Sequence, residues 1–265
     1  MKLIGLDIDG TLINSRKEIS EKTRTTLIKA MKEGHKVVIV TGRPTPGARE
    51  LADILEFKKY GGLLSTYNGG AITDCKENKT LTSHPMDMKL AREIVAFSKD
   101  LDLEIILPYE ETIYSRYKGK YAVSEAKNVN MNLEVVENLE DIVNFCPNKI
   151  LFAQDPDRID PPIKKLKEKF GEETEQMKSA RYFYEVMPKG PSKGKSLLEI
   201  AEIFDIDQKD IIAFGDEMND ISMLEMAGVG VAMGNAVPKI KEISDYITLS
   251  NDEDGIAYYL EKFVL

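Results

Sequence analysis

Apolar runs of strand length alternate with helical patterns in the first third of the chain. The runs cover residues 2–8, 36–41 and 62–66. They are nearly continuous and rich in β-branched residues, which is typical of strands buried on both faces. Two helices are expected between them, one from the N-cap Ser20 to Gly34 and one over residues 47–55. This order of elements predicts a parallel sheet flanked by helices.

The same alternation returns after residue 188. Strands are expected at residues 211–214, 229–232 and 246–249. Helices are expected at residues 195–204, 221–227, 238–243 and 256–263. The two ends of the chain therefore predict one α/β domain, built on a doubly wound, Rossmann-like parallel sheet.

The middle of the chain mixes helices and strands without that alternation. Helices are expected at residues 88–99 and 163–170, and strands at residues 104–107, 149–153 and 181–186. We interpret this part as a separate α+β domain inserted at a surface loop, where an insertion leaves the host core intact. The predicted domains are a core of residues 1–84 and 188–265, and an inserted domain of residues 85–187.

The chain is acidic, because its 265 residues carry a formal net charge of −9. That balance is not the basic footprint of a nucleic-acid-binding protein, and an anionic substrate has to meet a local cation. The two cysteines, Cys75 and Cys146, form no CxxC pair and indicate free thiols in a reducing compartment. Asp7 and Asp9 interrupt the first apolar run, so we do not expect it to be a signal peptide, and no apolar run has the length expected of a transmembrane helix. We therefore expect a cytoplasmic protein that binds neither nucleic acid nor membrane.

Two carboxylates follow the first apolar run directly. Asp7 and Asp9 stand one residue apart in the segment DIDGT, and residues i and i+2 of a strand point to the same face. The carboxyl ends of strands in a doubly wound sheet form a ligand crevice, so both carboxylates are expected to point into it. Two neighbouring carboxylates stay ionised together only beside a cation. An Asp-Gly pair alone would indicate a turn, but its place after the first strand favours a site.

Two further segments offer groups that bind phosphate oxygens. Thr41 and Gly42, at the end of the second apolar run, supply a hydroxyl and an accessible backbone amide. Lys193, just before a predicted helix, could place a point charge on a phosphate. Each has an ordinary structural explanation by itself, and the lysine segment is not a P-loop because Lys189 stands where the first glycine is required.

The segment GDEMND, after the predicted strand 211–214, is rich in oxygen ligands. It contains Asp216, Glu217, Asn219 and Asp220. One such residue would suffice to cap the next helix, so the group indicates a binding site. A donor set of oxygens alone selects a hard cation, and Mg²⁺ suits a site shared with phosphate. The only histidines, His35 and His84, lie outside these motifs, which argues against zinc and against a Ser-His-Asp triad.

The order DxDGT, TGR, a single lysine and GDxxND resembles the haloacid dehalogenase (HAD) superfamily. The insertion between TGR and Lys193 resembles the type-IIB cap of its Cof-type phosphatases. NGG at residues 68–70 and NDEDGIA at residues 251–257 also resemble that subfamily. The resemblance covers essentially the whole chain and is weakest across the cap. It implies a phosphatase whose cap selects the substrate.

The resemblance implies a role for each candidate residue. Asp7 would be the nucleophile that forms an aspartyl-phosphate, and Asp9 would be the general acid and base. Mg²⁺ would be held by Asp7, by the backbone carbonyl of Asp9 and by Asp216, with Asp220 as a positioning residue. Phosphate and substrate would be bound by Thr41, Gly42, Lys193 and Asn219. The substrate would be a small phosphorylated metabolite, and we favour a sugar phosphate.

Other functions stay open at this point. A phosphomutase of the phosphomannomutase type carries a similar cap and the same motifs, whereas the dehalogenases lack the acid at the position of Asp9. A non-enzymatic Ca²⁺-binding or phospho-accepting module is a third possibility. Its basis is a partial match to an EF-hand loop at Ser250, Asp252, Asp254, Gly255 and Glu261. That match has serine where aspartate is required, and a strand is predicted before it, so a turn ahead of the last helix is favoured.

The glycine-rich segment GVGVAMG, residues 228–234, does not have the spacing of a dinucleotide-binding fingerprint. It is better explained as a buried strand with a glycine at each end, so NAD binding is rejected. The sequence does not separate a monomer from a homodimer.

Overall fold

The computed structural model describes residues 1–265, which divide into two compact units. The core unit consists of Met1–Arg43, Ala48–Thr82 and Pro191–Leu265. The inserted unit consists of Pro44–Gly47 and Ser83–Gly190. The boundaries expected from the sequence lie after residues 84 and 187, and the short segment Pro44–Gly47 was expected to belong to the core. None of the helices has the length and apolar character needed to cross a bilayer.

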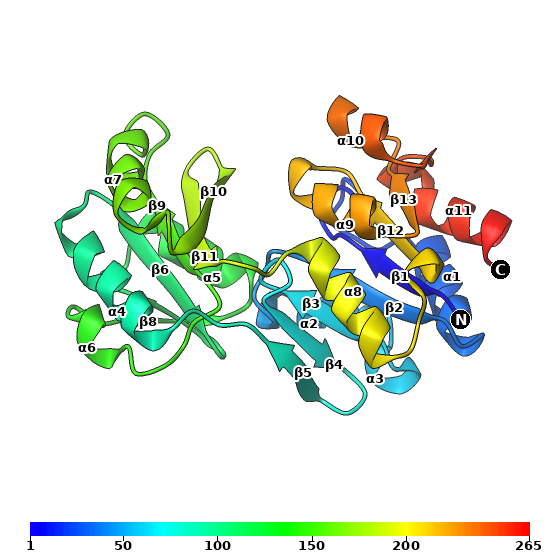
Figure 1. Cartoon of the computed structure of the whole chain (residues 1–265), viewed down its shortest axis with the longest axis horizontal. Helices are drawn as coiled ribbons and strands as arrows, with labels where there is room; N and C mark the ends of the chain where they lie inside the picture. The colour runs from blue at the N-terminus through cyan, green and yellow to red at the C-terminus, as the bar shows by residue number, and fades with distance from the viewer. The chain divides into compact units, whose positions relative to one another are not determined.

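An eight-stranded sheet forms the centre of the core unit (Figure 1). Its strand order is β14-β13-β12-β1-β2-β3-β4-β5. The strands are β1 (Leu3–Leu6), β2 (Lys36–Val40), β3 (Leu63–Thr66), β4 (Ala71–Asp74), β5 (Lys79–Ser83), β12 (Ile211–Gly215), β13 (Val229–Ala232) and β14 (Tyr246–Ile247). All neighbours from β14 to β3 pair in parallel, whereas β4 is antiparallel to β3. This confirms the predicted doubly wound, Rossmann-like sheet.

Strand β4 and the edge strand β5 were not predicted. The sequence of β5 is KTLTS, and all five residues are exposed or half-buried. An edge strand packs against few neighbours and needs no continuous apolar run, so the pattern that identifies central strands is missing here.

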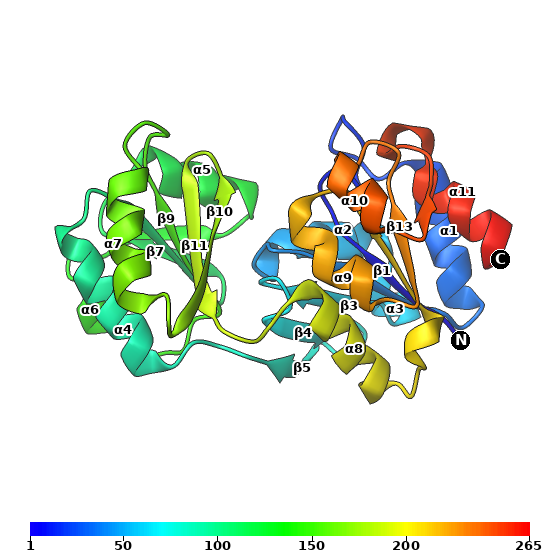
Figure 2. The same cartoon turned by 45° about the horizontal axis from the view of Figure 1, so that its top comes forward.

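Helices cover both faces of the core sheet (Figures 1 and 2). They are α1 (Glu21–Lys32), α2 (Pro46–Ile54), α3 (Phe57–Tyr60), α8 (Lys193–Ile203), α9 (Ile221–Met226), α10 (Pro238–Ile243) and α11 (Gly255–Phe263). α1 lies beside α11, and α8 lies beside α9 on the opposite face. The hydroxyl of Ser20 accepts a hydrogen bond from Thr23 N and caps α1, as predicted.

The inserted unit contains a second, six-stranded sheet in the order β10-β11-β9-β6-β7-β8. Its strands are β6 (Glu104–Tyr109), β7 (Thr112–Ser115), β8 (Asn132–Val135), β9 (Ile150–Ala153), β10 (Thr174–Ala180) and β11 (Phe183–Pro188). Its helices are α4 (Met88–Phe97), α5 (Lys120–Asn128), α6 (Leu139–Ile142) and α7 (Asp160–Phe170). The unit is α+β, as the sequence predicted, although β7, β8, β10, α5 and α6 were missed.

Alternate residues of the second sheet contribute to two separate hydrophobic cores. Ile105 and Phe152 pack with residues of α4, α6 and α7. Ile106 and Leu151 point the other way and pack with α5. The unit therefore buries both faces of its central strands and has its own core.

The pairing of β1 with β12 brings the two acidic motifs together. The strands are parallel, and Leu6 is in register with Phe214. Asp7 follows Leu6 directly, just beyond the end of β1, and Asp216 comes two residues after Phe214, just beyond the end of β12. Because both strands end at the same edge of the sheet, the two acids lie at the crevice where α/β sheets bind ligands.

Candidate active site

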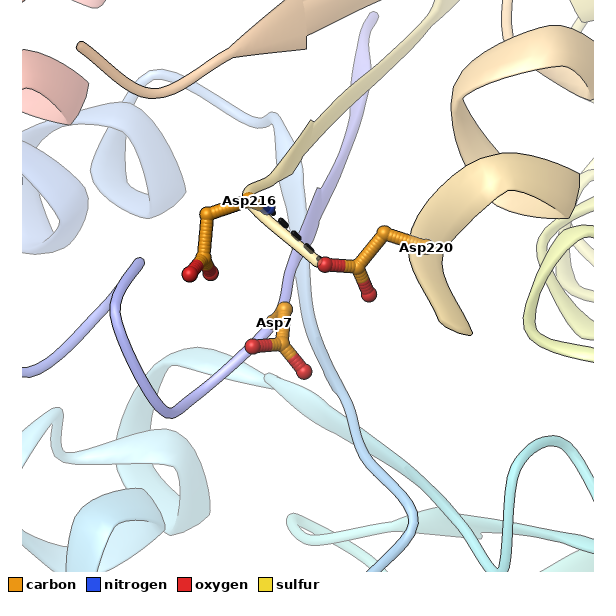
Figure 3. A group of neighbouring side chains, drawn as sticks. All are labelled: Asp7, Asp216 and Asp220. Carbon is orange, nitrogen blue, oxygen red and sulfur yellow. Dashed lines mark hydrogen bonds between the residues drawn. The ribbon is translucent and has the colours of Figure 1, made fainter. Parts of the chain in front are cut away.

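Three aspartates lie close together beyond the ends of β1 and β12 (Figure 3). The carboxylate oxygens that Asp7, Asp216 and Asp220 could offer to a metal lie within 4.8 Å of one another, and all three residues are buried. Asp7 follows β1, Asp216 follows β12, and Asp220 ends the short 3-10 helix η3 (Met218–Asp220). The structure thus brings together three of the residues that the sequence singled out.

Lys193 lies between two of these carboxylates. Its Nζ is 2.5 Å from Asp7 Oδ1 and 2.6 Å from Asp220 Oδ1, and its side chain is 1% exposed. The sequence placed this lysine just before a helix, but it is the first residue of α8. The hydroxyl of Ser192 caps that helix by accepting a hydrogen bond from Lys195 N. The start of α8 therefore fixes where the ammonium group lies.

The cluster holds more negative charge than Lys193 can neutralise. Burial raises the pKa of Asp7 to about 7, and the carboxylates of Asp220 and Asp216 add to the rise while Lys193 opposes it. Burial likewise raises the pKa of Asp216 to about 6. Burial alone would lower the pKa of Lys193, but Asp7 and Asp220 outweigh it and that pKa is raised. Three ionised carboxylates beside one ammonium group leave two negative charges uncompensated, which suits a divalent cation.

Hydrogen bonds orient Asp216 and Asp220. Asp220 Oδ2 accepts hydrogen bonds from the backbone N–H groups of Asp216 and Glu217, at 2.9 and 3.1 Å. The bond to Asp216 is the dashed line in Figure 3. Thr11 Oγ1 donates to Asp216 Oδ1 at 2.7 Å. Thr11 was not among the predicted site residues, although it is the threonine of DIDGT.

Gly10 lies directly against the Asp216 carboxylate. A Cβ at this position would be 2.2 Å from Asp216 Oδ2, and the φ angle of Gly10 is +83°. Both the space and the left-handed backbone conformation therefore require glycine.

Asp9 is not part of the cluster of three carboxylates. β1 ends at Leu6, so the alternation of a strand does not extend to Asp9. The Asp9 side chain is 50% exposed and accepts hydrogen bonds from Arg43 and Lys17, at 2.7 and 3.1 Å. These cations outweigh the effect of partial burial and lower the pKa of Asp9.

Neither partner of Asp9 was predicted from the sequence. Arg43 belongs to the TGR segment, which was examined only for its hydroxyl and its glycine. Lys17 lies in the loop before α1 and has a φ angle of +63°, and no local pattern distinguishes it from other lysines.

The predicted phosphate-binding turn follows β2. Thr41 is buried, and its Oγ1 accepts a hydrogen bond from Arg43 N at 3.2 Å. The side chain of Asn68 lies over Gly42, since a Cβ on that glycine would be 3.0 Å from Asn68 Oδ1. Asn68 N donates to Thr41 O at 2.9 Å, so the NGG turn supports TGR. Asn219, by contrast, is exposed within η3.

Comparison with known proteins finds similarity over almost the whole chain. Residues 4–260 match the family of haloacid dehalogenase-like hydrolases. The 5-amino-6-(5-phospho-D-ribitylamino)uracil phosphatase YcsE of Bacillus subtilis is 32% identical over 266 residues, which span 100% of this chain and 96% of that protein. The crystal structure of a haloacid dehalogenase-like hydrolase from Bacteroides thetaiotaomicron is 34% identical, with a TM-score of 0.93 over 98% of each chain. The subclass IIB sugar phosphatase BT4131 is 26% identical, with a TM-score of 0.83 over 99% of each chain.

Proposed function

Because this chain belongs to the haloacid dehalogenase-like hydrolases and is a phosphatase, we propose that it hydrolyses small phosphate monoesters with Mg²⁺ through an aspartyl-phosphate on Asp7. Sugar phosphates are the favoured substrates, a choice supported by the similarity to a subclass IIB sugar phosphatase. The observation that carries the proposal is the buried Asp7 carboxylate, which lies 2.5 Å from Lys193 in a cluster with two further carboxylates.

The residues present fit a magnesium ion. The donors are oxygens, they are clustered and buried, and Lys193 compensates only part of their negative charge. Asp7, Asp216 and the backbone carbonyl of Asp9 would hold the ion. When bound, Mg²⁺ supplies positive charge that stabilises the oxygens of the transferring phosphoryl group. Both carboxylate oxygens of Asp220 already accept hydrogen bonds, so we assign it to holding Lys193 and Asp216 in place.

The first chemical step transfers the phosphoryl group to the enzyme. A carboxylate oxygen of Asp7 bonds to phosphorus while the bond from phosphorus to the ester oxygen breaks. Asp9 gives its proton to the departing alkoxide, which leaves as an alcohol. The Lys193 ammonium, the Thr41 hydroxyl and the Gly42 amide bind the phosphoryl oxygens, and Asn219 contacts the phosphate or the leaving group.

The second step releases phosphate. The Asp9 carboxylate takes a proton from a water molecule, whose oxygen bonds to the phosphorus of the aspartyl-phosphate. The bond between phosphorus and the Asp7 oxygen breaks, and the Asp7 carboxylate is regenerated with free phosphate as the product. Each residue thus returns to its starting protonation state.

Asp9 has to change partners to act as an acid. Its ion pairs with Arg43 and Lys17 favour the ionised form, which has no proton to give. A phosphate ester is itself an anion and competes for these two cations. We infer that substrate binding draws them away from Asp9 and so allows its protonation.

The inserted domain, residues 85–187, is proposed to select among substrates. The proposal is supported by the similarity of the whole chain to a phosphatase of subclass IIB. The proposed location is the cytoplasm, on the ground that a chain with two unpaired cysteines suits a reducing compartment.

A panel of phosphate esters tests the proposal. Phosphate release is measured for sugar phosphates, nucleotides, FMN, pyridoxal phosphate and p-nitrophenyl phosphate, with and without Mg²⁺. We expect Mg²⁺-dependent release by the wild type and none by Asp7→Asn, whereas Asp53→Asn, an exposed acid of α2, keeps the activity. Release from no ester would contradict the phosphatase proposal. Conversion of a hexose 1-phosphate into its 6-phosphate without free phosphate would instead indicate a phosphomutase.

A further inference from the structure

The segment NDEDGIA, residues 251–257, has no part in the proposed chemistry but is hydrogen-bonded to the loop after the nucleophile. Asn251 Nδ2 donates to Ile13 O at 2.9 Å. Ser15 N donates to Asp252 Oδ1 at 2.8 Å, and the hydroxyl of Ser20 donates to Asp254. Three polar residues of the segment, Asn251, Asp252 and Asp254, therefore hold residues 13–20.

These contacts account for the acids that partly match an EF-hand. Strand β14 rather than a helix precedes the segment. Glu261, the last residue of the match, lies on α11 and pairs with Lys22 of α1. The one cluster of potential metal ligands in the structure is the group around Asp7. The acids of the segment act as hydrogen-bond acceptors between the end of the chain and its beginning.

Asn235 extends this network toward the nucleophile. It lies between β13 and α10, and its Nδ2 donates to Gly10 O at 2.8 Å. Its Oδ1 accepts a hydrogen bond from Asn251 N at 3.0 Å. The Asn235 side chain, which is also bonded to the backbone N–H of Asn251, thus holds the Gly10 carbonyl, while the Asn251 side chain holds the Ile13 carbonyl.

The loop that they hold places Asp9. Leu12 N donates to Asp7 O and Ile13 N donates to Ile8 O, each at 3.1 Å, so the loop folds back over the nucleophile. Gly10, which follows Asp9, lies against the Asp216 carboxylate. A shift of the Gly10 carbonyl would therefore move Asp9 relative to the rest of the site.

The segment that carries Asn235 is itself fixed to the Asp216 loop. Val237 N donates to Asp216 O, and Met233 N donates to Gly215 O, both at 3.0 Å. Asn235 consequently connects two loops. Its backbone segment is bonded to the loop of Asp216, and its side chain is bonded to the loop of Asp9. Asn235 is exposed, so its side chain does not contribute to the hydrophobic core.

We propose that Asn235 and Asn251 are positioning residues that hold the loop of Asp9 where this acid reaches the leaving oxygen of the substrate. The inference rests on the proposed function, since it takes Asp9 as the general acid. A purely structural role would affect all substrates alike. A role in placing the acid affects most the substrates that need protonation of the leaving group.

The test compares two esters in Asn235→Ala and Asn251→Ala. p-Nitrophenyl phosphate has a leaving group that needs little protonation, whereas glucose 6-phosphate, or the best alkyl phosphate of the panel, needs a proton. For the alkyl ester we expect kcat to fall about 10- to 100-fold with little change in KM, and for the aryl ester less than about threefold. Asn235→Gln, which keeps both the donor and the acceptor, should restore part of the loss.

Lys239→Ala is the matched control. Lys239 is an exposed residue of α10, close to Asn235 in the sequence, and its ion pair with Glu242 lies at the surface. This variant should resemble the wild type with both esters. The double variant Asn235→Ala/Asn251→Ala should lose less than the product of the two single losses, because both side chains hold carbonyl groups of the same loop.

Equal losses of kcat with the two esters, unchanged kcat in both single variants, or a change confined to KM would each overturn the inference. Thermal unfolding of every variant shows whether an equal loss reflects unfolding. The proposed function is tested separately with the wild-type protein. If the wild type released phosphate from neither ester, the proposed function itself would be wrong.

Discussion

Lys193 Nζ lies 2.5 Å from Asp7 Oδ1, although the two residues are 186 positions apart in the sequence. The same ammonium group is 2.6 Å from Asp220 Oδ1, and almost none of the lysine is exposed. A buried charge is tolerated only beside an opposite charge, so this contact links the stability of the fold to the charge needed for phosphoryl transfer.

Removing the lysine charge should destabilise the metal-free protein. Lys193→Met leaves three buried carboxylates without a counter-charge, and we expect it to lower the free energy of unfolding by about 3–5 kcal/mol. Urea denaturation without Mg²⁺ measures the change. Lys29→Met, at a surface lysine paired with Glu33, is the control and should change little.

The double variant Lys193→Met/Asp220→Asn separates charge from packing. Because it removes a carboxylate together with the lysine, it should lose less than the sum of the two single variants. If the losses of unfolding free energy in the two single variants simply added in the double variant, Lys193 and Asp220 would not stabilise each other, and this assignment would be wrong.

Mg²⁺ should stabilise the protein more at about pH 8 than at about pH 5.5. The pKa of Asp7 is raised from 3.8 to about 7 and that of Asp216 from 3.8 to about 6, so between these limits the folded metal-free protein binds more protons than the unfolded chain. The stability that these two groups contribute is fully present below their unfolded pKa and is lost as the pH rises through the folded values. Protons on Asp7 and Asp216 compete with Mg²⁺ for the carboxylate oxygens, so Mg²⁺ binds more tightly as the pH rises and these groups lose their protons.

Thermal unfolding at several pH values, with and without Mg²⁺, measures this dependence. A shift in Tm that is the same at both pH values would contradict the assignment of Asp7 and Asp216 as ligands. Asp216→Asn removes one of the two titrating groups and should weaken the pH dependence of the shift.

Gly10→Ala should weaken metal binding by displacing Asp216. The new Cβ would be 2.2 Å from Asp216 Oδ2, and changes behind a metal ligand typically reduce affinity by about 10- to 100-fold. Gly34→Ala is a closely matched control, because its φ of +90° is similar and nothing lies within 4 Å of the added Cβ. In both variants an alanine has to adopt a positive φ, so both should be strained alike. Only Gly10→Ala should change the apparent Mg²⁺ affinity, which is measured as the dependence of Tm on Mg²⁺ concentration.

Asp9→Asn should separate the two chemical steps. With alkyl phosphates kcat should fall by about 10²- to 10⁴-fold, because the leaving alkoxide receives no proton. With p-nitrophenyl phosphate the first step should persist, while the second step lacks its base. Intact-protein mass spectrometry after an acid quench should then show a phosphorylated enzyme, which Asp7→Asn cannot form. If Asp9→Asn lost both esters equally and formed no adduct, the assignment of Asp9 as acid and base would be wrong.

The predictable parts of the site are those that follow a strand directly. Asp7 and Asp216 could be placed because each comes within two residues of a continuous apolar run, and parallel strands end at a common edge. The alternation of faces could not place Asp9 relative to Asp7, because the strand ends at Leu6. Its partner Lys17 had no signal, since a lysine in a loop resembles any solvated lysine.

The sequence by itself determined the central strands of the core and the order of the acidic motifs, because apolar runs and strand ends are local patterns. It did not determine β4 or the edge strand β5, and the pairing of β5 depends on a neighbour rather than on its own composition. Only the tertiary structure decided that Lys193 lies between Asp7 and Asp220, and that Asn235 holds the Gly10 carbonyl. These contacts join residues 27 to 225 positions apart, and no local periodicity records which side chains meet when separate segments pack together.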